Sequence, residues 1–563
     1  MILQVLKDCS FWSQTVRNDP RYQEHRQLLE QTYLSKRYEE IPTLSYHNRA
    51  LFHQTGDRSM FEMPYFRRRH SLSAAAMLAL IYPEREEYLT YVSDMLWAIC
   101  DEYTWAVPAH TKGTLENDLV EIDLFNAETG FTLAEIHYVL GERLPRLVRD
   151  RVAAEVERRI FEPFSNRISC FEKLNSNWAA VCGGSVGGAM LYLDPARLEQ
   201  CMPRILKTMG QFIDGFSDEG VCMEGFSYWM YGFSAYLWFA DLLHAHTNGK
   251  IDLLADEKVE RIAGYLQSCF MKGNTTVSFS DGTPQGRVSP AVQGYLAKRF
   301  PASVSTMPKE CCALYRGNVF WLPFSREILY CPDPSVPVTD PLKNRDFPLA
   351  QQVIVHEEGY SLFAKAGHNA EEHNHNDVGS FILATEQYGQ VLCDIGSGYY
   401  TKKYFQAGME NRYSILCNSS LGHSVPIVNG QPQLCGRQYS GSIAHDGNCI
   451  RIEMAAAYGQ KAFSKLTRTL THEANKVILT DAFLPTYHSL TERFVTRILP
   501  TVEKGSVRIG NVRMEFDPEE VAVNIRKEAH QNHAGTFDPV YCIDCEVRPN
   551  REQVTVAFCV IDE

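Results

Sequence analysis

The periodicity of the apolar residues changes once along this chain, and the change predicts two parts that fold differently. Through roughly the first 320 residues the apolar side chains recur with the helical period, which predicts an all-α part. A proline-rich stretch at residues 332–337 resists helix formation, and short runs rich in Val, Ile, Thr, Tyr and Phe follow it. The sequence therefore predicts an α+β multidomain chain, with domains at residues 1–325 and 326–563.

The connections between the predicted helices are short, so consecutive helices should pair as hairpins. Repeated hairpins are typical of a ring or a solenoid. Because no strict sequence period is present, we favour an (α/α) toroid over a repeat array. The predicted helical segments are 71–82, 88–100, 115–140, 146–161, 178–193, 198–216, 223–246 and 258–271.

The second part alternates well enough to predict stacked antiparallel sheets in a β-sandwich. An active site shared by the two domains would lie in the cleft between them. The predicted strands are 360–366, 378–385, 390–394, 450–452, 465–470, 477–483, 490–499, 507–516 and 554–560.

Charge and cysteine usage narrow the class of protein. The net charge of -13 argues against a nucleic-acid or membrane-surface partner, although a locally basic cleft could still bind an acidic substrate. The 17 cysteines are scattered, which suits a reducing compartment, and the single CxxC at Cys542 and Cys545 is interpreted as two strand thiols. Because Lys7 and Asp8 interrupt the apolar N-terminus and no long apolar run follows, we expect a cytoplasmic protein of bacterial type.

Histidines and a carboxylate gather in the strand-rich part. His373 and His375 stand two residues apart, so on a strand they would share a face, and Asp394 and His423 follow them. Such a set can hold a metal and move a proton. From spacing alone, a polar turn with solvated histidines explains the same residues.

Three places in the helical part offer polar or aromatic groups. Asn177 and Trp178 open an apolar helix, either as a helix cap or as an amide donor to a substrate carboxylate. Glu224, Tyr228 and Tyr231 would fall at i, i+4 and i+7 of a helix, where they line a core or supply an acid and a base. The third place, residues 105–110, begins with Trp105 and ends with His110, which could contact a sugar.

In their order along the chain these motifs resemble the heparinase II/III-like polysaccharide lyases, a group that includes oligoalginate lyases and, more distantly, dermatan sulfate epimerase. The motifs that carry the resemblance are residues 105–110, 177–178, 224–231, 373–377, 394–398 and 422–431.

The resemblance implies an incomplete (α/α) toroid followed by a stacked antiparallel β-sandwich, and a mainly structural zinc ion held by His375, Asp394 and His423. It also implies that Tyr228 is the catalytic tyrosine and that His373 faces the substrate.

Asn177 would bind the uronate carboxylate by the same resemblance. Many relatives have a histidine where this chain has Trp178, so one imidazole of their site is missing here. Tyr231 is an alternative to Tyr228 as the working hydroxyl. Arg412 lies in a region that often contacts substrate, although a structural ion pair is an equal alternative.

These residues lead us to expect a lyase that cleaves uronic-acid-containing glycans by β-elimination, on imported oligosaccharides. Alternatives are a uronyl C5-epimerase, which shares the proton abstraction, and a non-catalytic glycan-binding protein. An acidic oligosaccharide or polysaccharide is the expected partner, and a homodimer is compatible with the resemblance.

Overall fold

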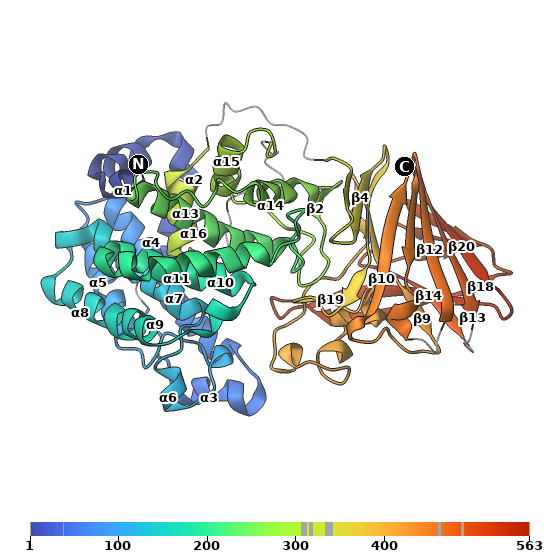
Figure 1. Ribbon diagram of the computed structural model, residues 1–563, viewed down its shortest axis with the longest axis horizontal. Coiled ribbons are helices and arrows are strands. Elements are labelled where there is room, and N and C mark those ends of the chain that lie inside the picture. Colours follow the sequence, from blue (N-terminus) through green and yellow to red (C-terminus); the bar gives the residue numbers. More distant parts are fainter. Residues whose placement is uncertain are drawn as a thin grey trace.

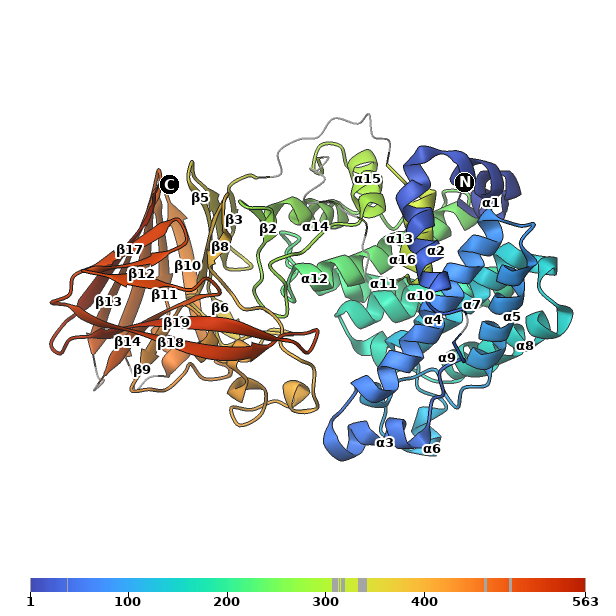
Figure 2. The ribbon, with the colours of Figure 1, turned by 180° about the vertical axis from the view of Figure 1, so that it is seen from behind.

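A computed structural model describes residues 2–37, 39–305, 312, 314, 319–332, 342–459, 463–485 and 489–561. A helical region and a region of antiparallel sheets lie side by side along the longest axis (Figure 1), and the view from behind shows the same division (Figure 2). The predicted toroid and sandwich are confirmed as fold classes. Most of the proline-rich stretch at residues 332–337 lies outside the described residues.

Paired helices form an incomplete (α/α) toroid. Its α-helices are α1 (Ile2–Lys7), α2 (Gln23–Leu34), α3 (Tyr46–Thr55), α4 (Ser59–Ile81), α5 (Glu86–Cys100), α6 (Leu115–Asp118), α7 (Leu124–Leu140), α8 (Arg146–Val156), α9 (Glu162–Asn166), α10 (Asn177–Leu193), α11 (Pro195–Asp214), α12 (Phe226–Tyr228), α13 (Ser234–His246), α14 (Glu257–Ser268), α15 (Pro290–Arg299) and α16 (Trp321–Leu329).

Helix α10 lies at the centre of this region and packs against α7, α11 and α13. Its glycines permit the close approach. A Cβ atom at Gly187 would lie 2.6 Å from the ring of Phe239, and one at Gly188 would lie 2.5 Å from the ring of Phe131. The tight packing fixes the first residue of α10, Asn177, at the inner end of the toroid.

Helix α16 closes the toroid through a buried ion pair. The guanidinium of Arg326 donates to Glu135 on α7 at 2.8 Å, and Trp321 and Tyr192 donate to the same carboxylate at 3.0 and 2.8 Å. The proposed boundary at residue 325 would cut through α16, whose residues on both sides of it pack in the helical core. A division after Leu329 therefore accords better with the packing.

Replacing Glu135 by alanine should lower the free energy of unfolding by about 3–5 kcal/mol, because it leaves the Arg326 charge buried without its partner. Denaturant unfolding of the variant measures this loss. The exposed Asp150, paired with Arg146, serves as the control, since Asp150→Ala should cost under about 1 kcal/mol. Equal losses in the two variants would contradict the role assigned to Glu135.

The β region holds most of the strands. They are β3 (Arg345–Phe347), β4 (Gln352–His356), β5 (Tyr360–Lys365), β6 (Gly367–Asn369), β7 (Phe381–Thr385), β8 (Gly389–Leu392), β9 (Pro426–Val428), β10 (Gly436–Asp446), β11 (Cys449–Glu453), β12 (Phe463–Glu473), β13 (Lys476–Pro485), β14 (Leu490–Thr496), β15 (Thr501–Glu503), β16 (Ser506–Ile509), β17 (Val512–Phe516), β18 (Val521–Gln531), β19 (Phe537–Val547) and β20 (Gln553–Val560). A short hairpin, β1 (Phe270–Met271) with β2 (Thr275–Thr276), precedes them.

Among the described residues these strands form three larger antiparallel sheets. Their orders are β15-β16-β17-β20-β13-β12-β11-β10-β6, β18-β19-β14-β9 and β3-β4-β5-β7-β8. Phe381, Phe494 and Phe558 come one from each sheet, and their ring centroids lie 5.2–6.3 Å apart. The apolar core between the stacked sheets is built around such contacts. No helix in the described part of the chain is long and apolar enough to cross a membrane.

Candidate active site and metal centre

A cavity of about 2200 Å³ opens where the two regions meet. The helical region contributes Asn177 and Tyr228 to its wall, and the β region contributes His373 and Tyr400. The predicted cleft between the domains is therefore present, and it collects residues that stand more than 200 positions apart in the sequence.

Asp281 is the carboxylate around which this wall is organised, and it is fully buried. Its two oxygens form hydrogen bonds with two histidines. One oxygen lies 2.6 Å from His373 Nδ1, and the other lies 3.2 Å from His375 Nε2. The hydroxyls of Tyr400 and Tyr404 also donate to it. Burial alone would raise the pKa of this carboxyl, but the hydrogen bonds from the two histidines bring it well below its usual range.

The loop that carries Asp281 reaches the site through close backbone contacts. Gly225 adopts a φ of +97°, and a Cβ atom there would lie 2.9 Å from the carbonyl oxygen of Phe279. Gly396, with a φ of +64°, approaches the carbonyl oxygen of Gly282 in the same way. Glycine at these positions lets three loops meet around Asp281.

His373 and Tyr228 lie face to face at the cavity wall. Their ring centroids are 4.1 Å apart with an interplanar angle of 29°, and the His373 side chain is 18% exposed. The hydroxyl of Tyr228 lies 2.8 Å from that of Tyr400. Burial, followed by the negative charge of Asp281, raises the pKa of the Tyr228 phenol. Tyr228 therefore carries its proton at neutral pH.

Asn177 and Glu224 form a second polar pair beside this wall. The Asn177 amide donates to Glu224 Oε2 at 2.9 Å, and the same oxygen lies 3.7 Å from His373 Nε2. Burial raises the pKa of Glu224, although His373 and Asn177 oppose the shift. The structure thus brings Asn177, Glu224, Tyr228 and His373 together.

Tyr231 also lines the cavity but belongs to another group of residues. It lies beside Glu128 of α7, and burial raises the pKa of that glutamate to about 8. The predicted stripe of Glu224, Tyr228 and Tyr231 on one helix is wrong in detail. The helix begins only at Phe226, after Gly225, and a π-helical turn at Trp229–Phe233 changes the spacing.

His110 and Trp178 line the cavity together, with ring centroids 4.9 Å apart, and His110 Nδ1 contacts Asp123 at 2.8 Å. Trp105 does not join them. Its ring is fully buried in the helical core and its indole donates to the Ile99 carbonyl, so the predicted sugar contact at Trp105 is wrong.

Arg412 is also buried, and its side chain supports the site from behind. The guanidinium donates to the carbonyl oxygens of Asn374 and Tyr404 and lies 3.5 Å from Asp281. Arg412 does not line the cavity, so the predicted substrate contact is wrong. The alternative, a structural ion pair, agrees with its position beside Asp281.

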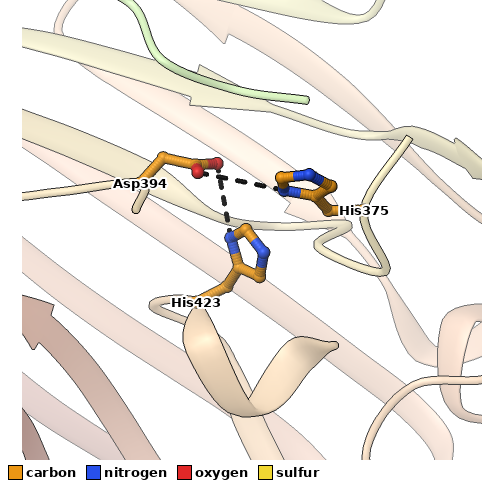
Figure 3. A group of neighbouring side chains, drawn as sticks. All are labelled: His375, Asp394 and His423. Carbon is orange, nitrogen blue, oxygen red and sulfur yellow. Dashed lines mark ion pairs between the residues drawn. The ribbon is translucent and has the colours of Figure 1, made fainter. Parts of the chain in front are cut away.

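His375, Asp394 and His423 converge in a buried group below the cavity wall (Figure 3). His375 Nδ1 lies 3.9 Å from one Asp394 oxygen, and His423 Nδ1 lies 3.3 Å from the other. His373 and His375 occupy a turn rather than a strand, so they do not share a strand face as predicted, although both contact Asp281.

The donor set fits a metal ion. Both Nδ1 atoms are buried and lie 3.3–3.9 Å from Asp394 without a hydrogen bond of good geometry. The opposite nitrogen of each ring is held, His375 Nε2 by Asp281 and His423 Nε2 by the Cys417 carbonyl at 2.7 Å. That arrangement orients metal-binding histidines in proteins, and two imidazoles with one carboxylate are a common zinc set.

Replacing His423 by alanine should remove about one tightly held metal ion per chain, because only two ligands of the group remain. Elemental analysis of the purified protein measures this. Cys542→Ala is the control, since Cys542 and Cys545 lie in the interior of β19 as strand thiols. Unchanged metal content in His423→Ala would show that the ion binds elsewhere.

Several residues of the site were missed by sequence reasoning. Asp281 and Tyr404 lie in segments without a recognisable pattern, and Glu128 lies inside the predicted helix at residues 115–140 with nothing in the sequence to mark it as functional. The Asp-Gly pair at residues 281–282, after a stretch in which apolar and polar residues alternate, is the one available signal for a turn there.

Comparison with solved structures places the fold among polysaccharide lyases. Heparinase III aligns with 88% of this chain and 76% of its own, at 12% identity and a TM-score of 0.62. The heparan sulfate lyase HepC from Pedobacter heparinus aligns with 100% of this chain and 88% of its own, at 12% identity and a TM-score of 0.60. The chondroitin AC lyase of Streptomyces coelicolor A3 aligns with 100% of this chain and 83% of its own, at 9% identity and a TM-score of 0.57. No protein family model and no curated protein sequence matches the chain.

Proposed function

We propose that this protein is a polysaccharide lyase that cleaves uronic-acid-containing glycans by β-elimination. The observation that carries the proposal is the stacked pair of Tyr228 and His373 at the cavity wall, with His373 held by the buried Asp281. The heparinase-type fold supports it. Lys36, Arg287 and Lys402 also line the cavity, which suits an acidic chain.

His373 is the proposed base. Asp281 accepts a hydrogen bond from His373 Nδ1–H, so Nε2 of the neutral ring keeps its lone pair. That nitrogen takes the C5 proton of the uronate, and Asp281 stabilises the imidazolium that forms.

Tyr228 is the proposed acid. The Tyr400 hydroxyl donates its hydrogen bond to Asp281 at 3.1 Å. In the free protein the Tyr228 hydroxyl therefore donates to the Tyr400 oxygen. A substrate O4 atom at this place receives the Tyr228 proton instead as the C4–O4 bond breaks. The raised pKa of Tyr228 keeps that proton available.

Asn177 and Glu224 bind the uronate carboxylate in this proposal. Negative charge builds on that carboxylate when C5 loses its proton, and fixed donors stabilise it. The Asn177 amide is one donor, and Glu224 becomes a second when it is protonated, the form that its burial favours. A metal at His375, Asp394 and His423 would fix the loop that carries His373.

Mass analysis of the products tests the proposal. Oligosaccharides of heparan sulfate, chondroitin, hyaluronan and alginate are incubated with the protein, in water and in heavy water. Elimination predicts a fragment one water lighter than the hydrolysis product. Deuterium at C5 without cleavage would instead indicate a uronyl C5-epimerase. Unchanged sugars would indicate a non-catalytic glycan-binding protein. Action on imported oligosaccharides in the cytoplasm stays a prediction of the sequence.

A further inference from the structure

A second pair of histidines lies far from the cavity, at the margin of the β region. His445 belongs to β10 and His472 to β12, two strands of the nine-stranded sheet that are separated by β11. Asp346 of β3 and Glu357, directly after β4, reach the pair from the five-stranded sheet. The four side chains therefore connect two sheets.

The contacts form a linear chain of carboxylate, imidazole, imidazole and carboxylate. His445 Nδ1 lies 2.9 Å from Asp346, and His472 Nδ1 lies 2.8 Å from Glu357. The two Nε2 atoms face each other at 3.0 Å. The side chain of His472 is 6% exposed and that of His445 is 14% exposed, so water has limited access to the pair.

This geometry determines which nitrogens carry protons. A carboxylate only accepts hydrogen bonds, so each Nδ1 must donate. Two neutral rings would then point two lone pairs at each other across 3.0 Å. Something positive must lie between the Nε2 atoms, which is either a proton on one ring or a metal ion.

We propose that His445 and His472 bind a divalent transition metal ion of the zinc class through their Nε2 atoms, with water completing its shell. Nitrogens bound to one tetrahedral zinc at about 2.0–2.1 Å lie roughly 3.3 Å apart, close to the distance found here. Histidine ligands almost always donate their other nitrogen to a carboxylate or carbonyl, as both rings do. The ion would join β10 and β12 to the five-stranded sheet.

Zinc binding by the whole protein tests this site. The purified protein is passed over a chelating resin that removes weakly held ions, its remaining metal is measured, and it is then dialysed against buffered zinc chloride. Wild type is expected to take up one zinc ion per chain more than His445→Gln or His472→Gln. Glu357→Gln should weaken that uptake by about 10–100-fold, because it loses only the orienting carboxylate.

His368→Gln is the matched control. His368 also pairs with a carboxylate, Glu371 at 2.8 Å, and its removal should leave zinc uptake at the wild-type level. Metal retained through the resin should be the same in all variants, which separates this site from the buried group at His375. Equal uptake by wild type and both histidine variants would overturn the proposal. The absence of uptake by wild type would also overturn it, and a proton shared between the two rings would then explain their short contact.

Discussion

Replacing Asp281 by asparagine is expected to lower kcat by about 10³–10⁴-fold. The carboxylate faces donors on every side: two imidazoles, two phenols and, at 3.5 Å, the guanidinium of Arg412. An amide keeps the size but offers one accepting oxygen, and its NH2 group opposes the remaining donors. His373 is then free to adopt the tautomer whose Nε2 carries a proton and cannot act as a base.

The measurement is kcat of purified Asp281→Asn on the substrate identified by product analysis. Asp241→Asn is the matched control, because Asp241 also accepts from two tyrosine hydroxyls, those of Tyr295 and Tyr330, but does not line the cavity. Its kcat should stay within a few-fold of wild type. If Asp281→Asn kept wild-type kcat, His373 would not be the base that Asp281 orients.

Tyr228→Phe is expected to lower kcat by about 10²–10⁴-fold with little change in KM, because it removes the proton donor to the leaving oxygen and keeps the ring that stacks on His373. Steady-state kinetics at several pH values measure the loss. Tyr400→Phe should have a smaller effect, because it removes the acceptor of the Tyr228 hydroxyl and one donor to Asp281 but leaves the proposed acid in place.

Tyr231→Phe is the control for this experiment. Its hydroxyl lies beside Glu128, away from the pair formed by Tyr228 and His373, so its loss should cost less than about tenfold. A larger loss in Tyr231→Phe than in Tyr228→Phe would assign the acid to Tyr231.

The two-part architecture could be predicted because each part repeats one period over a long stretch. The site was predicted less completely, because its geometry depends on loops. His373 and Glu224 are recognisable in the sequence as chemical groups. Their positions in the site depend on Gly225 and on the turn at His373, and these two backbone features do not follow helical or strand spacing. Asp281 reaches the site because Phe279 and Gly282 pack closely against these loops, and no local pattern in the sequence indicates those contacts.

Trp105 shows the opposite error. A tryptophan five residues before a histidine predicts a sugar contact, but the two side chains separate in the fold. His110 reaches the cavity and Trp105 packs inside the toroid, where its indole finds a carbonyl. Burial depends on the packing of distant helices, so the local motif could not reveal it.

The most direct test of the central claim is the ultraviolet absorbance of the conjugated double bond, followed while the protein acts on uronic-acid oligosaccharides and polymers. The account predicts a steady rise with at least one glycan class, which Tyr228→Phe nearly abolishes and Tyr231→Phe leaves largely intact. A rise that Tyr228→Phe leaves unchanged would contradict the proposed acid, and no rise with any glycan of the panel would contradict the lyase.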